Sequence, residues 1–357
     1  MAIPVFVPTL PSVHELIPYL EEIESSQIYS NFGPLVLKLH QRLAEYFGVS
    51  ECQVITLSNA TLALEGAVQT SSLPSTKWIS PSWTFAATNL AIKRSGVEFS
   101  FGDVDSDWRL LPEDPSSFIL DVCPFGAPLD LSRFGITDTP TLVDAAASFP
   151  ALEGCGSQIN SCTNPVGIVV SFHPTKILPG IEGGVFISNR TEWVEQVRSW
   201  SRFGMEKGSR SSKNIGTNAK MSEYQAAVIM ASLQKYISLK DSWFEKHRSA
   251  QQIAQSVGVK NHPSMIQESL STYWVIESDP HNINLIERES VNAGFHTKRW
   301  WEYGCHKMPV FKNIGHRGLE NTNRISNSTI GLPFHLKLNS EDFELIYSTL
   351  SLVLSRG

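Results

Sequence analysis

The sequence has few charged residues and no long apolar run. Charged residues make up 18% of the 357 residues, below the roughly 25% that is usual in globular domains. No segment has the ~18 consecutive apolar residues of a membrane-spanning helix, so a membrane protein is not expected. A low charge content is compatible with a large buried interface between subunits, so we expect an oligomer.

Blocks of basic residues and metal-binding motifs are also missing. The net charge of −6 argues against a nucleic acid or an anionic membrane as the main partner. The N-terminal sequence MAIPVFVPTLPSVHEL has neither a basic start nor a long apolar stretch, so a signal peptide is not expected. The five cysteines show no Cys-x-x-Cys or Cys/His ligand spacing. We therefore expect a cytoplasmic protein with reduced thiols and no metal site.

In the first part of the sequence, short apolar runs alternate with helical patterns, which is typical of a parallel sheet covered by helices on both faces. Shorter strands and loops follow after about residue 240, and Ser340 is a candidate N-cap of a final amphipathic helix. We predict an α/β fold with a large domain at 1–240 and a smaller α+β domain at 241–357. The expected strands are 53–58, 77–81, 97–104, 117–122, 141–146, 167–172 and 184–189, and the expected helices are 60–69, 83–96, 221–239, 241–257 and 340–355.

Polar residues follow several of these strands, where open parallel sheets bind their ligands. In LSNATLALEG, small polar residues open a helix whose backbone N–H groups form a candidate phosphate site. An ordinary N-cap at Ser58 or Asn59 is the simpler interpretation. Asp144 ends the apolar run TLVDAA, and a buried carboxylate needs a cation or a strong donor beside it. A helix cap or a structural hydrogen bond would also explain this carboxylate.

A single lysine, Lys176, follows the apolar run 167–172. A surface lysine is one interpretation, but burial at a strand end favours the neutral, nucleophilic amine that Schiff-base chemistry requires. A lysine, a carboxylate and an anion site together complement pyridoxal phosphate (PLP), through its aldehyde, ring nitrogen and phosphate. Trp83 in SPSWTFAAT is a candidate stacking face for the ring, or a core residue.

The segment SFHPTKILPGIEGGVFISN resembles the lysine motif of the DegT/DnrJ/EryC1/StrS aminotransferases, and the similarity extends along almost the whole chain. It includes YSNFGPLVLKLHQRLAEYFGV, LSNATLAL, SPSWTFAATNLAI, GTNAKMSEYQAAV and IGLPFHLKLNSEDF. These are fold-type-I PLP enzymes that act mainly on nucleotide-linked keto-sugars. The resemblance implies a mostly parallel central sheet, a smaller C-terminal domain, and a homodimer with shared active sites.

The resemblance also implies a role for individual residues. Lys176 would bind PLP as a Schiff base and then move a proton between two carbon atoms. Asp144 would pair with the protonated ring nitrogen. The other cofactor-binding residues would be Ala60, Thr61 and Ser171 at the phosphate, Trp83 on the ring face and, at the phosphate from the other side, Asn218 of the partner subunit.

The implied activity is transfer of an amino group from an amino acid, L-glutamate by resemblance, to a nucleotide-linked keto-deoxysugar. A pyridoxamine phosphate form carries the amino group between the two substrates, in deoxyamino sugar or polysaccharide biosynthesis. One position departs from the family, which often has glutamine near the cofactor where this sequence has Ala147. Related dehydratases carry histidine in place of the lysine, so the retained Lys176 favours aminotransfer.

Two alternatives stay open. The substrate could be a keto-cyclitol or another carbonyl compound without a nucleotide, or the protein could be regulatory and not catalytic. Retention of both Lys176 and Asp144 argues against the second alternative. Two further segments have two interpretations each. The basic segment 198–214 is either a solvated loop or a lid that meets a nucleotide diphosphate, and KRWWEYGCHKMPVF (298–311) either lines the substrate site or packs the small domain.

Overall fold

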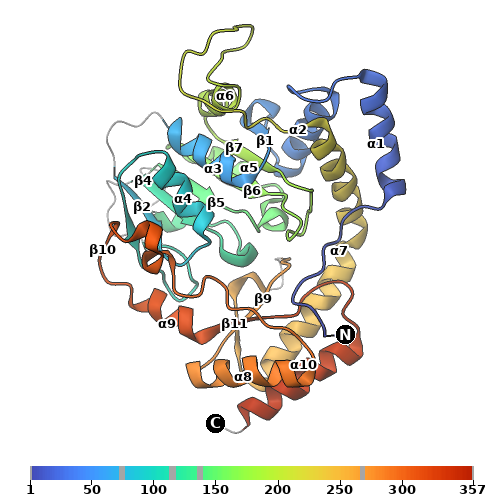
Figure 1. The fold of residues 1–357 in the computed structure, drawn as a ribbon, viewed down its shortest axis with the longest axis vertical. Helices are drawn as coiled ribbons and strands as arrows, with labels where there is room; N and C mark the ends of the chain where they lie inside the picture. The colour runs from blue at the N-terminus through green and yellow to red at the C-terminus, as the bar shows by residue number, and fades with distance from the viewer. Residues whose placement is uncertain (1, 72–76, 112–117, 135–139, 266–269, 356–357) are drawn as a thin grey trace.

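The computed structural model describes residues 2–71, 77–111, 118–134, 140–265 and 270–355. In these ranges an eight-stranded sheet has the strand order β1-β7-β6-β5-β4-β2-β3-β10, and a three-stranded sheet has the order β11-β9-β8. The large sheet and its helices form the upper part of the molecule in Figure 1, and the small sheet lies below them with α8 and α10.

The strands of the large sheet are β1 (Val54–Leu57), β2 (Trp78–Pro81), β3 (Phe99–Gly102), β4 (Phe118–Val122), β5 (Thr141–Asp144), β6 (Val166–Ser171), β7 (Gly184–Ser188) and β10 (Gly315–His316), and those of the small sheet are β8 (Lys260–Asn261), β9 (Trp274–Glu277) and β11 (Thr329–Leu332). The α-helices are α1 (Val13–Ser26), α2 (Pro34–Phe47), α3 (Ala60–Gln69), α4 (Ala86–Arg94), α5 (Gly156–Asn160), α6 (Thr191–Trp200), α7 (Glu223–Val257), α8 (Pro280–Ala293), α9 (Glu320–Ser328) and α10 (Ser340–Leu354). Short 3-10 helices lie at Glu51–Gln53, Pro124–Gly126, Leu131–Phe134, Phe149–Leu152, Pro263–Met265, Cys305–Lys307 and Pro309–Phe311. No helix in the described ranges is both long enough and apolar enough to cross a membrane.

The large sheet is mostly parallel. β3, β2, β4, β5 and β6 run parallel to one another, β10 adds a parallel strand at the β3 edge, and only β7 is antiparallel to its neighbours β1 and β6. The predicted α/β class with a mostly parallel sheet is confirmed. Each strand predicted in the first part of the sequence is present, with ends shifted by a few residues.

Successive side chains of the central strands pack into two different cores. Val143, Ile168 and Val170 share a core with residues of α2 and α7. Leu142 and Val169 share another core with residues of α3, α4 and α6. Because neighbouring side chains of a strand point to opposite faces, both faces of the sheet are buried, and this explains the near-continuous apolar strands.

One helix, α7, replaces the two helices predicted at 221–239 and 241–257. It begins at a capping box, in which Ser222 and Gln225 each bond the backbone N–H of the other, and it ends at Gly258 with φ of 73°. Neither Gly nor Pro interrupts it, so no residue provides a break near 240. The predicted boundary between 1–240 and 241–357 therefore falls inside a continuous helix, and this division of the chain stays a prediction.

The N-cap predicted for the last helix is displaced by one residue. The side chain of Asn339, not Ser340, accepts a hydrogen bond from the N–H of Asp342 at 2.9 Å. The carboxylate of Asp342 in turn accepts from the N–H of Asn339. Asparagine and aspartate form this reciprocal cap as well as serine and glutamate do, which is why the sequence pattern alone did not separate the two positions.

Candidate active site

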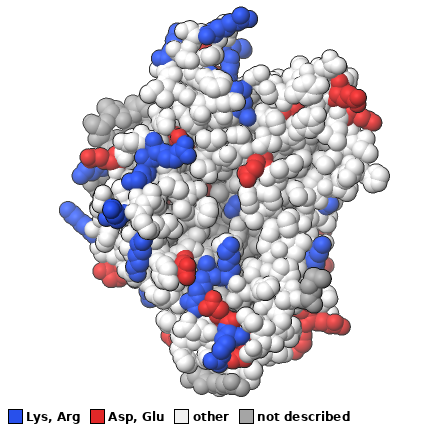
Figure 2. All heavy atoms as spheres, viewed as in Figure 1, with Lys and Arg blue, Asp and Glu red and all other residues white. Residues whose placement is uncertain are grey.

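A cavity of about 710 Å³ opens at the carboxyl ends of β4, β5 and β6. Residues at the N-terminal ends of α3 and α4 form one side of it, and Tyr273, Lys298, Trp300 and Trp301 form the other. The surface in Figure 2 is hollowed near its centre, between the part that holds the large sheet and the part that holds α8 and α10. The cavity thus lies where open parallel sheets bind their ligands.

Lys176 reaches this cavity from the loop between β6 and β7. The N–H of Phe172 donates to the carbonyl of Gly183 at 2.9 Å, and this bond closes the base of the loop. The N–H of Lys176 donates to the carbonyl of His173 at 2.8 Å. The side-chain nitrogen donates to the hydroxyl of Tyr273 at 3.0 Å. The loop therefore holds the backbone of Lys176 in place while its amine faces the cavity.

Asp144 also lines the cavity, at the end of β5, and its side chain is buried. Its Oδ2 accepts a hydrogen bond from Thr88 Oγ1 at 2.7 Å, and its Oδ1 accepts one from the N–H of Ala146 at 3.1 Å. Burial raises the pKa of Asp144 above its ordinary value of 3.8, although these two hydrogen bonds and the charge of Lys176 partly offset the effect. A carboxylate in such a place is stabilised by a positive ligand group beside it.

The N-terminal end of α3 forms another wall of the cavity, through Ala60 and Thr61. The side chain of Asn59 caps the helix by accepting the N–H of Leu62 at 2.9 Å. The first N–H groups of a helix have no partner within the helix, so those of Ala60 and Thr61 are available to an anion. Ser171, at the end of β6, lies on the same cavity. The structure thus brings together the three residues expected at a phosphate.

Gly184 of β7 permits this arrangement. It pairs with Leu57 of β1 and Ser171 of β6, on either side of it in the sheet. A Cβ atom at this position would lie 2.6 Å from the backbone nitrogen of Ala60. Only a residue without a side chain lets β7 pass so close to the start of α3, so the phosphate site depends on the glycine-rich turn of the lysine motif.

The structure does not bring Trp83 to the cavity, and this corrects the stacking role expected for it. Trp83 is fully buried and packs edge-on against Trp108 and Trp301, with ring centroids 6.3 Å and 5.3 Å away. The N–H of Thr84 donates to the carbonyl of Ser82 at 3.1 Å, in a bend that separates Trp83 from the cavity wall. The aromatic residue that lines the cavity here is Phe85, which is 64% exposed.

Asn218 lies outside the cavity of its own chain. It is exposed, and its side-chain oxygen accepts a hydrogen bond from Lys220 at 2.5 Å. Its backbone pairs with that of Arg202, at the base of the basic segment 198–214. The tip of this segment projects from the molecule, with basic side chains along it (Figures 1 and 2). The expected contact of Asn218 with a partner subunit's cofactor stays a prediction.

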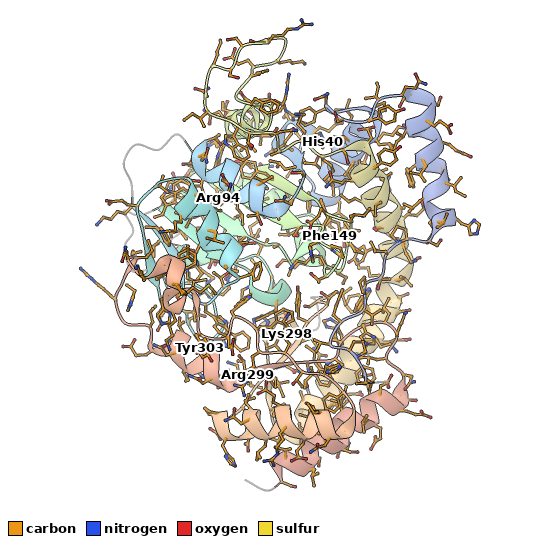
Figure 3. The ribbon with its side chains drawn as sticks, viewed as in Figure 1. His40, Arg94, Phe149, Lys298, Arg299 and Tyr303 are labelled. Atoms are coloured by element: carbon orange, nitrogen blue, oxygen red, sulfur yellow. The ribbon has the colours of Figure 1, made fainter. Side chains whose placement is uncertain are left out.

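Several residues of the cavity carried no sequence signal of their own. Tyr273 lies directly before β9 of the small sheet. Thr88, on the buried face of α4, does not line the cavity but holds Asp144, which does. Arg94, near the end of α4, pairs with the buried Glu65 of α3 at 3.1 Å. Lys298 lines the cavity and lies toward the small sheet and α8 in Figure 3. In the segment KRWWEYGCHKMPVF, Lys298, Trp300 and Trp301 line the cavity. Its buried residues Cys305 and Phe311 pack against the large sheet, where Phe311 contacts Phe99 and Phe101 of β3, and not into a separate small-domain core.

The sequence profile of the DegT/DnrJ/EryC1/StrS aminotransferase family matches residues 12–351. The chain belongs to this family. The dTDP-4-amino-4,6-dideoxy-D-glucose transaminase of Shigella dysenteriae is 27% identical to it, over 97% of this chain and 98% of the relative. The UDP-4-amino-4,6-dideoxy-N-acetyl-beta-L-altrosamine transaminase of Campylobacter jejuni is 23% identical over 91% of each chain.

Solved structures of aminotransferases have the same fold. DesI, crystallised with its TDP-sugar product, matches with a TM-score of 0.85 at 26% identity, over 100% of this chain and 94% of DesI. NtdA of Bacillus subtilis, solved with bound PMP, matches with a TM-score of 0.82 at 20% identity, over 96% of this chain and 82% of NtdA. The chain is therefore an aminotransferase that uses PLP, as the sequence predicted.

The residues of the cavity fit this cofactor. Asp144 is a buried carboxylate that favours a positive ring nitrogen beside it, and Lys176 supplies an amine for the aldehyde. The N-terminal end of α3 supplies N–H groups for a phosphate, and Phe85 supplies an aromatic face. Ala147, the position at which the sequence departs from the pattern expected for the family, also lines the cavity.

Proposed function

We propose that this aminotransferase transfers an amino group from L-glutamate to a keto-deoxysugar linked to a nucleoside diphosphate. The named relatives support this proposal, because their names give amino-dideoxy sugars on dTDP or UDP, the compounds that amination of such a keto-deoxysugar would yield. The product that DesI holds in its crystal structure is also a TDP-sugar. A location in the cytoplasm, expected from the sequence, is part of the same proposal.

The extent of the cavity is the observation that carries the proposal. It reaches from Lys176 to Trp300, Trp301 and Lys298 on one side, and along α3 and α4 to Glu65 and Arg94 on the other. Its volume of about 710 Å³ is in the range of roughly 300–1,000 Å³ that holds ligands of drug size. The aromatic walls suit the sugar and base rings, and the two cations suit a diphosphate. A small carbonyl substrate would need neither.

The residues of this chain have distinct roles in the proposal. When bound, PLP supplies an aldehyde that condenses with amines and a ring that stabilises negative charge on an attached carbon. The Lys176 amine would hold the aldehyde and, when an amino acid has taken its place, would move a proton at the substrate carbon. Asp144 would keep the ring nitrogen protonated. Phe85 would lie against the ring, and Ala60, Thr61 and Ser171 would hold the phosphate.

The first test separates the two half-reactions. Purified protein with PLP should be yellow, and L-glutamate should bleach the colour and release 2-oxoglutarate in an amount equal to the sites. A nucleotide-linked keto-deoxysugar should then restore the colour. Free nucleoside diphosphate should slow this second step, because it occupies the same cavity. Restoration of the colour by keto-cyclitols without such competition would instead support a substrate without a nucleotide.

A homodimer with shared sites is part of the proposal. Several large apolar side chains are exposed in the single chain, among them Phe85 of the cavity wall and Phe203, Ile215 and Tyr224 of the segments on either side of Asn218 in the sequence. Burying them between two copies would remove much apolar surface from water.

Mixing two variant chains tests whether the two subunits of the dimer share their active sites. If Asn218 acts in the partner's site, a mixed dimer of Lys176→Ala and Asn218→Ala chains has one doubly altered site and one intact site. We expect the mixture, after subunit exchange, to be more active than the sum of the two separate variants. Sedimentation velocity should give the mass of a dimer for both. Absence of any gain from exchanged dimers would contradict shared sites.

A further inference from the structure

The contact between Lys176 and Tyr273 has no role in the function described so far. The amine nitrogen of Lys176 lies 3.0 Å from the hydroxyl oxygen of Tyr273 and 5.3 Å from the centre of its ring. The amine is therefore at the hydroxyl end of the side chain and not over the ring face. A tyrosine hydroxyl both accepts and donates hydrogen bonds, so it binds a lysine amine in its charged and its neutral form.

The chain before β9 is fixed so that Tyr273 meets Lys176. The hydroxyl of Thr272 donates to the carbonyl of Thr175 at 2.9 Å, next to Lys176 itself. The hydroxyl of Ser271 donates to the carbonyl of Phe125 at 2.5 Å and accepts the N–H of Tyr273 at 3.0 Å. These bonds connect one short segment of the small domain to two loops of the large sheet.

The ring of Tyr273 is also held on two sides. Trp300 packs edge-on against it with ring centroids 5.2 Å apart, and Phe125 packs at 5.6 Å with a tilt of 59°. Aromatic contacts of this kind favour one orientation of the ring over others. The hydroxyl therefore has a defined position at the place where the Lys176 amine enters the cavity.

The charges around Tyr273 also indicate that it interacts with Lys176. Burial by itself raises the pKa of Tyr273, but the charge of Lys176, the hydrogen bonds from Lys176 and Thr175, and the charge of Lys298 outweigh it. The net effect is a pKa below the ordinary value of 10.0. The positive charge of Lys176 favours the ionised phenol, so the ionisation of the two side chains is coupled.

We propose that Tyr273 is a positioning residue that holds the Lys176 amine at the place from which it transfers protons at the substrate carbon. This inference rests on the role of Lys176 in the proposed function. A lysine side chain has many rotamers, and a free amine visits most of them. Proton transfer needs the amine within hydrogen-bond reach of the reacting carbon. The hydroxyl of Tyr273 restricts the amine to that region whenever it is not bonded to the cofactor.

The test is Tyr273→Phe, which removes the hydroxyl and keeps the ring. In a single turnover with L-glutamate, bleaching should slow by roughly 10- to 100-fold, the effect of losing one hydrogen bond to a charged group. The affinity for glutamate should change little. The slowing should be greater with glutamate deuterated at its α-carbon, because proton transfer becomes the limiting step. The melting temperature should stay near that of the wild type.

Two further variants serve as controls. Tyr303→Phe makes the same chemical change at an exposed tyrosine of the segment that carries Lys298 (Figure 3), and it should leave the rate unchanged. Thr272→Val removes one of the bonds that place Tyr273 but keeps the Tyr273 hydroxyl, so it should slow bleaching, and raise the isotope effect, less than Tyr273→Phe does. A wild-type rate in Tyr273→Phe, or slowing without a larger isotope effect, would overturn the proposal. Equal slowing with an equal rise of the isotope effect in Thr272→Val would do the same.

A second measurement needs neither substrate nor cofactor. Ultraviolet titration of the cofactor-free protein should show one tyrosine that ionises below the ordinary range of roughly 10. This tyrosine should be missing in Tyr273→Phe, and its pKa should rise in Lys176→Ala. No change in Lys176→Ala would show that the two groups are not coupled and would overturn the inference. If the wild type fails to react with glutamate while this coupling is present, the donor is wrong and the role of Tyr273 stands.

Discussion

Replacing Lys176 with alanine is expected to lower turnover by at least about 10⁴-fold, because the variant loses both the amine that binds PLP and the group that moves the proton. The purified variant should not retain the cofactor after reduction with borohydride. Wild-type protein treated in the same way should carry the cofactor on the peptide that contains Lys176. Mass spectrometry of the digested protein, together with the rate of 2-oxoglutarate release, measures both effects.

Lys298→Ala is the matched control for this experiment. Lys298 is the other lysine of the cavity wall in the described part of the chain, and it is exposed. Its replacement removes a positive charge of the same kind from the same cavity. The variant should still carry the reduced cofactor on Lys176, even where its use of substrates is impaired. Attachment of the cofactor to another residue in the Lys176→Ala protein would contradict the role of Lys176.

The placement of Lys176 and Asp144 was predictable because it depends on local sequence. Asp144 ends one run of apolar residues and Lys176 lies four positions after another, and such runs are reliable signs of buried strands when helices separate them. In a parallel sheet the carboxyl ends of neighbouring strands lie at one edge. β5 and β6 are neighbours in the sheet, so the residues after them open into the same cavity.

The choice between Trp83 and Phe85 depended on geometry that the sequence does not contain. Both aromatics lie between a strand and a helix, two positions apart. Which of them faces the cavity is decided by the bend at Ser82–Thr84 and by the pocket that Trp108 and Trp301 form around Trp83. Trp301 lies more than two hundred positions later in the chain. Core packing, the simpler alternative for Trp83, is what the structure shows.

Tyr273 was beyond prediction for the same physical reason. Its segment reads as the start of an ordinary strand, and that strand belongs to the small sheet. Two hydrogen bonds, each between residues 97 positions apart in the sequence, hold this segment beside Lys176. Contacts of this kind arise from the way the two sheets pack, and they produce no periodic pattern in the sequence. The active site is thus predictable where it is built from strand ends, and not where the second sheet completes it.

Replacing Asp144 with asparagine is expected to lower turnover by about 10²- to 10³-fold, the usual effect of losing one electrostatic partner in a site that excludes water. The amide has nearly the same shape, and its oxygen still accepts one of the hydrogen bonds from Thr88 or Ala146. It has no negative charge, so it no longer keeps a ring nitrogen protonated. Single-turnover bleaching by L-glutamate measures the loss without interference from the second substrate.

The effect of the same substitution on stability depends on pH. Burial raises the pKa of Asp144 above 3.8 in the folded chain, so the folded chain binds this proton more tightly than the unfolded chain does. Between the ordinary pKa and the raised one, the free energy of unfolding therefore falls as pH rises. Above the raised pKa the carboxylate is charged in the folded chain, and the full cost of its burial lowers the free energy of unfolding. Without cofactor, the melting temperature of Asp144→Asn should therefore rise relative to wild type as pH increases from acidic to neutral.

Adding PLP should reverse the relative stability of wild type and Asp144→Asn at neutral pH. A positive ring nitrogen beside the carboxylate compensates for its burial, so PLP should stabilise the wild type more at neutral pH than at acidic pH. Asp144→Asn should gain less from PLP, and its gain should lack this pH dependence. Thr88→Val is the control, because it removes the hydrogen bond to Oδ2 and keeps the charge, so its gain should still depend on pH. Equal stabilisation of wild type and Asp144→Asn at neutral pH would mean that the carboxylate does not meet the ring nitrogen, and the raised pKa of Asp144 would then reflect burial alone.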